Sequence, residues 1–337
     1  MKLLAFLLAG LTLASGAPSV AQEDFYRGKT VNFLISHPPG GGFDLYARLY
    51  ARHLSKHLPG SPAVVAQNMP GAAGVVMANY MASQAVRDGT TIGLGPGALV
   101  TAALFGMPGA RYDARSFNWI GSLNTEVAVT VSWFNSSIKN AEDLRTKELV
   151  VGGGGATDGS VIFPVAVSKV LGLKIKVIPG YNGTAAIALA MERGETEGIG
   201  AWNYSSIVAG KPHWLSEKKI NILAQLSLEP HPDLPKVPTV LDLSADENQR
   251  MLLKLVFAQS SVGRAIYAPP GVPEARMSVL RRAFDEMLKD PEFIADAQKS
   301  SLEINQPLSG SEITKLIAEL HEYDPELIRK AAQAIVP

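Results

Sequence analysis

Short apolar runs and amphipathic runs alternate along this chain from Phe25 onward. Short runs rich in β-branched side chains predict buried strands, whereas apolar residues that recur every three or four positions predict helices. Because the two patterns alternate, we expect an α/β protein with mainly parallel strands. The predicted strands are Val31–Ser36, Ala63–Gln67, Thr91–Leu94, Leu149–Gly152, Lys174–Ile178, Gly198–Trp202, Ile220–Leu226 and, as the last, Ala265–Ala268.

The helical pattern lies between these strands and dominates the end of the chain. The predicted helices are Asp44–Leu58, Val75–Ala85, Asn140–Leu144, Val161–Leu171, Ala185–Arg193, Glu274–Lys289, Pro291–Lys299 and Ser311–Gln333. The length of the chain favours two domains. The apolar runs 119–123 and 127–131 favour a crossover between them, and the Pro-rich segment Glu229–Pro238 favours a return linker. We therefore predict a discontinuous domain 1 of residues 22–125 and 229–337, and a domain 2 of residues 126–228.

A Gly-rich turn, Pro39-Gly40-Gly41-Gly42, connects the first predicted strand to the first predicted helix. The first N–H groups of a helix have no partner within it, and the helix dipole adds positive charge there, so this end attracts anions. Glycines carry no Cβ, which lets a ligand approach the backbone closely. The turn predicts a cradle for a carboxylate or phosphate, although an ordinary strand-to-helix connection has the same pattern.

A second turn of this kind follows the predicted strand Leu149–Gly152, where Gly152–Gly155 leads through residues 156–160 into a helix. The third predicted strand also ends in a Gly/Pro loop, Gly95-Pro96-Gly97. Ligands of open α/β sheets bind outside the carboxyl ends of strands, which is where such loops lie. We expect the two glycine-rich turns, one in each domain, to face each other across a cleft and to share one anion.

The N-terminus and the charge balance indicate an exported protein. Lys2, the apolar run Leu3–Leu13 and Ser19-Val20-Ala21 predict a signal peptide over residues 1–21, because the apolar run is too short for a membrane anchor. The absence of cysteine excludes lipid attachment and disulfides. The 31 basic and 31 acidic residues argue against a nucleic-acid partner and against adhesion to anionic lipid. We expect a soluble, exported monomer.

Motifs for catalysis or metal binding are incomplete. His53 and His57 have zinc-pair spacing but lack the glutamate of HExxH and a third ligand, so we expect them on an exposed helix face. The 152–160 loop lacks the Gly-Lys-Ser/Thr of a nucleotide loop, and Ser136-x-x-Lys139 lacks the partner motifs of a serine acyl-transferase. We expect no enzyme, catalytic residue, cofactor or metal. A hydrolase would need a nucleophile and a base within hydrogen-bond reach across the cleft, and we expect none.

The chain resembles the periplasmic solute receptors of tripartite tricarboxylate transporters, also called the Bug family. The resemblance rests on motifs that run in family order over nearly the whole mature chain: Pro39–Arg48, Gln67–Gly74, Asp88–Ile92, Gly152–Ser160, Pro179–Gly183, Leu234–Thr239 and Ala268–Pro273. It implies a two-lobed type II periplasmic-binding-protein (Venus-flytrap) fold that closes on a small carboxylate. It also implies that the protein delivers this ligand to membrane permease subunits.

By this resemblance, ligand contacts come from the loop 37–44, the end of the third strand, the loop 157–160 and residues 181–184. The candidate ligand-binding residues are Ser36, Pro39, Gly41, Gly42, Phe43, Asp44, Gly95, Thr157, Asp158, Ser160, Tyr181, Thr184 and Asn203. These loops hold few cations, so we expect neutral donors to bind the carboxylate. Asp44 would alternatively satisfy the helix N-terminus or pair with Arg48, and Tyr181 would alternatively lie in the core.

Three features depart from the family pattern: His37, Asn182 and the number of glycines in Gly152–Gly155. All lie at or near the expected site, so the choice among di-, tri-, aromatic and amino carboxylates stays open. His37 beside the cradle would make binding pH-dependent, but a solvent-facing or capped His37 is the favoured interpretation. Two other functions also stay open: a clamp that docks on a signalling partner, and an exported hydrolase.

Overall fold

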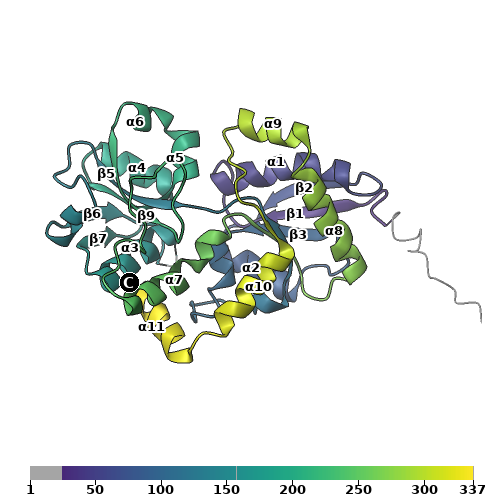
Figure 1. The fold of residues 1–337 in the computed structure, drawn as a ribbon. Coiled ribbons are helices and arrows are strands. Elements are labelled where there is room, and N and C mark those ends of the chain that lie inside the picture. Colours follow the sequence, from purple (N-terminus) through teal and green to yellow (C-terminus); the bar gives the residue numbers. More distant parts are fainter. Residues whose placement is uncertain (1–24, 157, 337) are drawn as a thin grey trace, which may run out of the picture.

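The structure is a computed structural model of the 337-residue chain and describes residues 25–156 and 158–336. The predicted signal peptide and the candidate contact Thr157 lie outside the described residues. The described part forms two β-sheets that are flanked by helices and lie side by side (Figure 1).

The first sheet has six strands in the order β11-β4-β10-β3-β1-β2. Their bounds are β1 (Thr30–Ile35), β2 (Ala63–Asn68), β3 (Thr91–Gly95), β4 (Asn118–Ser122), β10 (Ala265–Ala268) and β11 (Leu308–Ser309). β1 pairs in parallel with β2 and β3, whereas β10 runs antiparallel to β3 and β4. The loops after β1, β2 and β3 therefore meet at one edge: a Cβ on Gly74 would lie 3.1 Å from Pro96 Cδ and 3.2 Å from Ser36 Cβ.

The second sheet has five strands in the order β7-β6-β8-β5-β9. Their bounds are β5 (Ala128–Trp133), β6 (Leu149–Gly152), β7 (Ile175–Ile178), β8 (Gly198–Asn203) and β9 (Ile220–Leu226). β6 is parallel to β7 and β8, while β5 is antiparallel to both β8 and β9. Because most strands share one direction in each sheet, the predicted fold class is confirmed.

Most of the predicted helices lie close to their expected bounds, but the helices over residues 204–210, 212–216 and 247–257 were not predicted. Their bounds are α1 (Gly42–His57), α2 (Val75–Ser83), α3 (Gly159–Leu171), α4 (Thr184–Glu192), α5 (Tyr204–Gly210), α6 (Pro212–Ser216), α7 (Glu247–Phe257), α8 (Glu274–Met287), α9 (Pro291–Lys299), α10 (Gly310–His321) and α11 (Pro325–Ile335). The predicted helix at 140–144 is a 3₁₀ turn, Glu142–Arg145, whose N-cap is Ala141, while Asn140 Oδ1 accepts the N–H of Asp143.

The apolar spacing of α1 explains how this helix is fixed on the first sheet. Tyr46, Leu49, Tyr50 and Leu54 recur at three- and four-residue intervals, and all are at most 2% exposed. The ring of Tyr50 packs 5.1 Å from the ring of Phe33 on β1, measured between centroids. Burial of one such side chain contributes about 1.5–3 kcal/mol, so this face holds the start of α1 in place at the end of β1.

Two predictions about the end of the chain are wrong. The single helix predicted over Ser311–Gln333 is split into α10 and α11, because Pro325 cannot continue a helix and Asp324 caps a new one by accepting from the N–H of Glu326. The strand Ala265–Ala268 is also not the last, since β11 pairs antiparallel with β4. β11 is too short to leave a periodic pattern.

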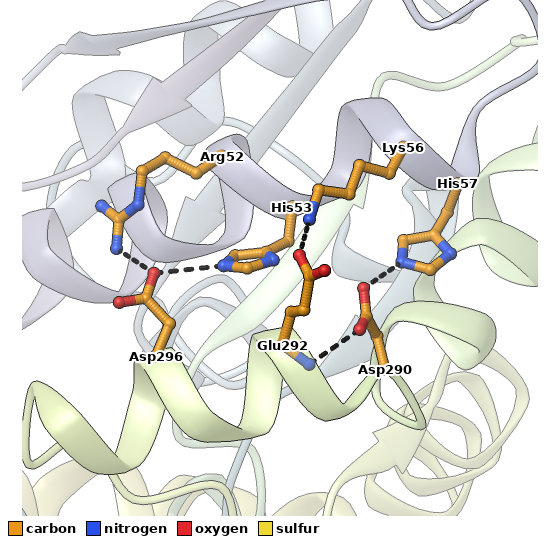
Figure 2. A network of polar contacts seen from close by, with 7 residues as sticks. All are labelled: Arg52, His53, Lys56, His57, Asp290, Glu292 and Asp296. Atoms are coloured by element: carbon orange, nitrogen blue, oxygen red, sulfur yellow. Dashed lines mark hydrogen bonds and ion pairs between the residues drawn. The ribbon is translucent and has the colours of Figure 1, made fainter.

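The expectation of an exposed face at His53 and His57 is also wrong. His53 is only 7% exposed, and its Nε2 lies 3.1 Å from Asp296, while His57 Nε2 lies 3.1 Å from Asp290. Figure 2 shows the whole network between α1 and α9, which joins Arg52, His53, Lys56 and His57 to Asp290, Glu292 and Asp296. Among residues 25–156 and 158–336, no group of three His, Cys, Asp or Glu side chains is placed to hold a metal.

The chain passes between the sheets from β4 to β5 and again from β9 to β10. α10 packs on β4 of the first sheet, whereas α11 packs against α7 and against α3, which lies on the second sheet (Figure 1). The domain boundaries at 125/126 and 228/229 stay a prediction. In the part of the chain that the structure describes, no helix has the length and apolarity needed to cross a bilayer.

Candidate functional site

The turn between β1 and α1 is the first of the two predicted cradles. Gly40 has a φ of +83°, a left-handed conformation that favours glycine. α1 begins at Gly42, and its N-cap residue, Gly41, supplies no side-chain cap. The first N–H groups of α1 therefore lack the hydrogen bonds that a capping side chain would provide, and they stay available to an anion.

Asp44 fastens this turn from within. It is 4% exposed, and its carboxylate accepts from Gly40 N at 2.9 Å, from Arg48 Nε at 3.0 Å and from Asn68 Nδ2 at 2.9 Å. Burial would raise the pKa of Asp44, but the hydrogen bonds from Arg48, Gly40 and Asn68 outweigh it and lower the pKa. The carboxylate thus satisfies the turn and pairs with Arg48, and its direct contact with a ligand stays a prediction.

His37 lies at the entrance of the same turn. Its ring stacks on Phe43 with centroids 4.0 Å apart, and its Nδ1 lies 2.8 Å from Ser36 Oγ. Burial, together with the nearby charge of Arg264, lowers the pKa of His37 to about 4, although Asp158 opposes both. His37 is therefore neutral at neutral pH.

The hydrogen bond between Ser36 and His37 joins neighbours in one loop, and Ser36 is 1% exposed. An imidazole with a pKa near 4 is a weak general base at neutral pH. This pair is not one that spans the two lobes, so the predicted absence of a nucleophile–base pair across them stays a prediction.

The second glycine-rich turn, before α3, is built differently. Asp158 is the N-cap of α3 and accepts from Ser160 N at 2.8 Å and from Ser160 Oγ at 2.6 Å. Ser160 Oγ in turn accepts from Gly154 N at 2.9 Å. The N-terminus of α3 is thus satisfied by an acidic side chain of its own. The charge of Asp158 opposes the lowering of the pKa of His37 in the first turn.

The remaining candidates lie at strand ends and helix starts. Gly95 is buried at the end of β3, and Thr184 and Asn203 are half-buried at the start of α4 and the end of β8. The ring of Tyr181 covers Gly152, whose Cβ would lie 3.1 Å from Tyr181 Cε2. Tyr181 is therefore partly packed on the second sheet, and the ligand contacts of these four residues stay predictions.

The sequence analysis missed a buried ion pair beside the first turn. Arg264, directly before β10, is 1% exposed, and its Nη1 lies 2.8 Å from Glu126 Oε2. Its guanidinium carbon lies 4.3 Å from the ring centroid of Phe43 and 4.8 Å from that of Tyr46. Glu126 Oε1 also accepts from Ser205 Oγ at 2.9 Å. The available signal was a lone charge at the edge of each of two apolar runs.

Gly42, Ser206 and Arg264 converge where the two lobes touch, and we call these three residues the interlobe junction. A Cβ on Gly42 would lie 3.5 Å from Arg264 Nη2 and 3.6 Å from Ser206 Oγ. Gly42 starts α1 on the first sheet, whereas Ser206 belongs to α5 on the second. The open N-terminus of α1 therefore meets a hydroxyl group of the other lobe and a cationic side chain.

Two hollows lie elsewhere. An apolar cavity of about 20 Å³ is lined by Ala72, Ala73, Val75, Ala98, Leu99, Thr101, Ala102, Phe105, Met107, Ile162, Gln259 and Ile335. A hollow of about 330 Å³ beside α3 and β7 is lined by Ala156, Val161, Val165, Ser168, Lys169, Ile175, Val177 and Pro179. None of the predicted ligand contacts lines either one, and the smaller is sized for about one water molecule.

Two α/β lobes, crossing strands and strand-end loops that meet between the lobes define a periplasmic solute-binding protein fold. The chain belongs to the family described as "Tripartite tricarboxylate transporter family receptor" (TctC), which it matches over residues 46–332. This is a family of periplasmic solute-binding receptors, so the predicted family is confirmed.

Individual relatives are distant but cover nearly the whole chain. BugT of Bordetella pertussis is 26% identical over 297 residues, which cover 83% of each chain. The structure of MatC from Rhodopseudomonas palustris with bound malate superposes with a TM-score of 0.67 at 19% identity, over 90% of this chain and 99% of MatC. R. palustris Rpa4515 with adipate gives a TM-score of 0.67 at 21% identity, over 92% and 99% of the two chains. These likenesses confirm the fold.

Proposed function

We propose that this protein is an exported receptor that captures a small carboxylate between its two lobes and delivers it to a tripartite membrane permease. The observation that carries the proposal is the open N-terminus of α1, which meets Ser206 of the other lobe at the interlobe junction. Membership of the TctC receptor family supports the same function. Residues 1–21 direct export, and the mature protein acts as a monomer without a cofactor.

A carboxylate that leaves water must regain its hydrogen bonds inside the protein. Each bond to a charged group contributes about 1.5–3 kcal/mol. Four or five bonds, less the costs of desolvation and ordering, are compatible with micromolar affinity, which corresponds to about 8 kcal/mol. Contacts to both lobes would also favour the closed conformation, which is what a permease recognises.

The ligand class is supported by two structural neighbours, which are described with malate and with adipate. We propose a carboxylate of similar size, held by backbone and hydroxyl groups at both turns. The proposed contacts are Ser36, Pro39, Gly41, Gly42, Phe43, Asp44, Gly95, Thr157, Asp158, Ser160, Tyr181, Thr184 and Asn203.

Calorimetry tests this function directly. The mature protein is unfolded, dialysed and refolded to remove co-purified ligands, and is then titrated with malate, succinate, adipate, citrate, glutamate and benzoate. We expect at least one of these acids to bind at about micromolar concentration. If none of them binds to refolded protein whose circular dichroism matches the native state, the proposal is wrong.

Transport and signalling are separated by an uptake assay. Cells that express the permease subunits and take up the radiolabelled ligand only when this protein is present would support delivery to a permease. Uptake that is unchanged by its removal would contradict delivery and favour a signalling partner.

A further inference from the structure

We propose that Arg264 determines specificity by binding a ligand carboxylate through the Nε/Nη2 edge of its guanidinium group. This inference rests on the proposed carboxylate-binding function and deepens it by naming a cationic residue that the glycine-rich turns do not contain. Three observations support it: the free hydrogen-bond donors of Arg264, their geometry and their position.

The donors of Arg264 are divided unequally. Nη1 bonds to Glu126 Oε2 at 2.8 Å and to the carbonyl oxygen of Gly263 at 3.1 Å. Nε is buried without a partner, and Nη2 makes no hydrogen bond to any residue that the structure describes. A buried donor on a charged group is costly to leave unsatisfied, so the unpaired Nε calls for a functional explanation, and the unbonded Nη2 lies on the same edge of the guanidinium.

This edge has the geometry that a carboxylate needs. The Nε–H and one N–H of Nη2 point in the same direction and match the two oxygens of a carboxylate, which is why arginine binds this group in a bidentate manner. Arg48 of the same protein shows the arrangement, with Nε and Nη2 each 3.0 Å from an oxygen of Asp44. In Arg264 the equivalent edge is free.

The surroundings hold this edge at the interlobe junction. Phe43 and Tyr46 contact the guanidinium through their ring faces, and Glu126 binds it at Nη1, so its position is fixed without use of the Nε/Nη2 edge. Nη2 lies beside Gly42, and Ser206 Oγ, which makes no hydrogen bond within the described part of the chain, lies on the other lobe at the same point. A carboxylate placed there receives the arginine edge, the N-terminus of α1 and a hydroxyl group from across the junction.

This arrangement has a consequence for specificity. All the groups that converge at the junction can donate hydrogen bonds, and one of them is permanently charged. An ionised carboxylate accepts from all of them, whereas a carboxamide of the same shape would direct its own NH₂ group at donors. The receptor is therefore expected to reject an amide analogue of its ligand, because buried donors would be left unpaired.

The decisive variant is Arg264→Lys, which keeps the charge beside Glu126 but lacks the bidentate edge. Its affinity is measured by calorimetry with the acid of the panel above that binds the wild type most tightly. We expect a loss of at least about tenfold, and a smaller loss would overturn the inference. The matched control is Arg281→Lys. Arg281, on α8, donates to the carbonyl oxygen of Trp119 and to Glu274 and lies outside the junction, so this variant should bind the acid as tightly as the wild type.

A second measurement reads the wild-type protein itself and uses variants only to assign one signal. In wild-type protein, the ¹H–¹⁵N signal of Arg264 Nε is assigned by its loss in Arg264→Lys or Arg264→Gln, and the acid is then titrated in. We expect a large downfield proton shift as the unpaired donor gains a carboxylate, and an unchanged Nε signal with bound acid would overturn the inference. If wild type binds no acid of the panel, the proposed function fails together with this inference, whereas binding with an unmoved signal refutes the inference alone.

Discussion

The turn before α1 and the turn before α3 share a run of glycines but differ in their electrostatics. The first has no side-chain cap and lies beside Arg264, while the second is capped by Asp158. A helix N-terminus attracts an anion only while its N–H groups are free, and a carboxylate at the N-cap both uses them and repels a second anion. The two turns are therefore electrostatically unlike: the first has helix N–H groups without a side-chain cap beside a cationic side chain, whereas the second is capped by a carboxylate.

Mutation of the buried ion pair between Glu126 and Arg264 should have the largest effect on stability. Glu126→Ala leaves Arg264 charged and without its ion-pair partner inside the protein, so we expect a loss of about 3 kcal/mol in the free energy of unfolding. The measurement is urea unfolding followed by circular dichroism. Glu274→Ala is the control, because it removes the exposed partner of Arg281 and should cost less than about 1 kcal/mol. Similar losses in both variants would contradict a buried, charge-holding role for Glu126.

The titration of His37 tests the positive environment of the first turn. Burial lowers its pKa from 6.5 to about 4. Between about pH 4 and pH 6.5, His37 is therefore mostly protonated in the unfolded chain and mostly neutral in the folded protein. The contribution of neutral His37 to the free energy of unfolding is fully present above about pH 6.5, and it is lost as the pH falls toward about 4. When the pH is lowered from about 7 to 4.5, the free energy of unfolding of the wild type should fall by about 2 kcal/mol more than that of His37→Gln. Urea unfolding at each pH measures this difference.

Parallel stability curves for the wild type and His37→Gln over this pH range would show that His37 is not buried beside the positive charge of Arg264. Direct titration of the His37 ring signals by NMR provides an independent check, because it reports the pKa of this side chain without unfolding the protein.

The cap of the second turn should have the smallest effect. Asp158→Ala removes the acceptor of Ser160 N at the start of α3, for which we expect a loss of about 1 kcal/mol. Asp324→Ala, which removes the N-cap of α11, should cost a similar amount. Only Asp158→Ala should also lower the pKa of His37 further, since Asp158 opposes that shift. An unchanged His37 titration would place the two turns too far apart to share a site.

Local pattern was sufficient for most of the fold. The β9 bounds, Ile220–Leu226, and the α9 bounds, Pro291–Lys299, were predicted to the residue, because apolar runs and a proline at the first helical turn carry their own signals. Pro325 is a local signal for a helix boundary. The amphipathic spacing continues on both sides of it, however, and this led to the prediction of a single helix.

The candidate site depended on contacts between residues that are far apart in sequence. The expectation that neutral donors alone bind the carboxylate was drawn from the loops, whereas Arg264 reaches the first turn from the strand after the second crossing between the sheets. His53 and His57 likewise meet carboxylates of α9 that no local spacing reveals. Periodicity reports which face of an element is buried, but it does not report which charged side chain arrives from a distant segment.

The C-terminal helix gives the receptor a mechanical property. After α10 packs on the first sheet, the short connection Glu322–Asp324 leads to α11 on the other lobe, where Lys169 Nζ of α3 lies 3.4 Å from the carbonyl oxygen of Gln333. If the two sheets swing apart, α11 either travels with α3 or is peeled from it. The short connection between α10 and α11 therefore limits how far the two lobes can separate while α11 stays packed on α3. A fluorophore attached after α11 would then move with the second lobe.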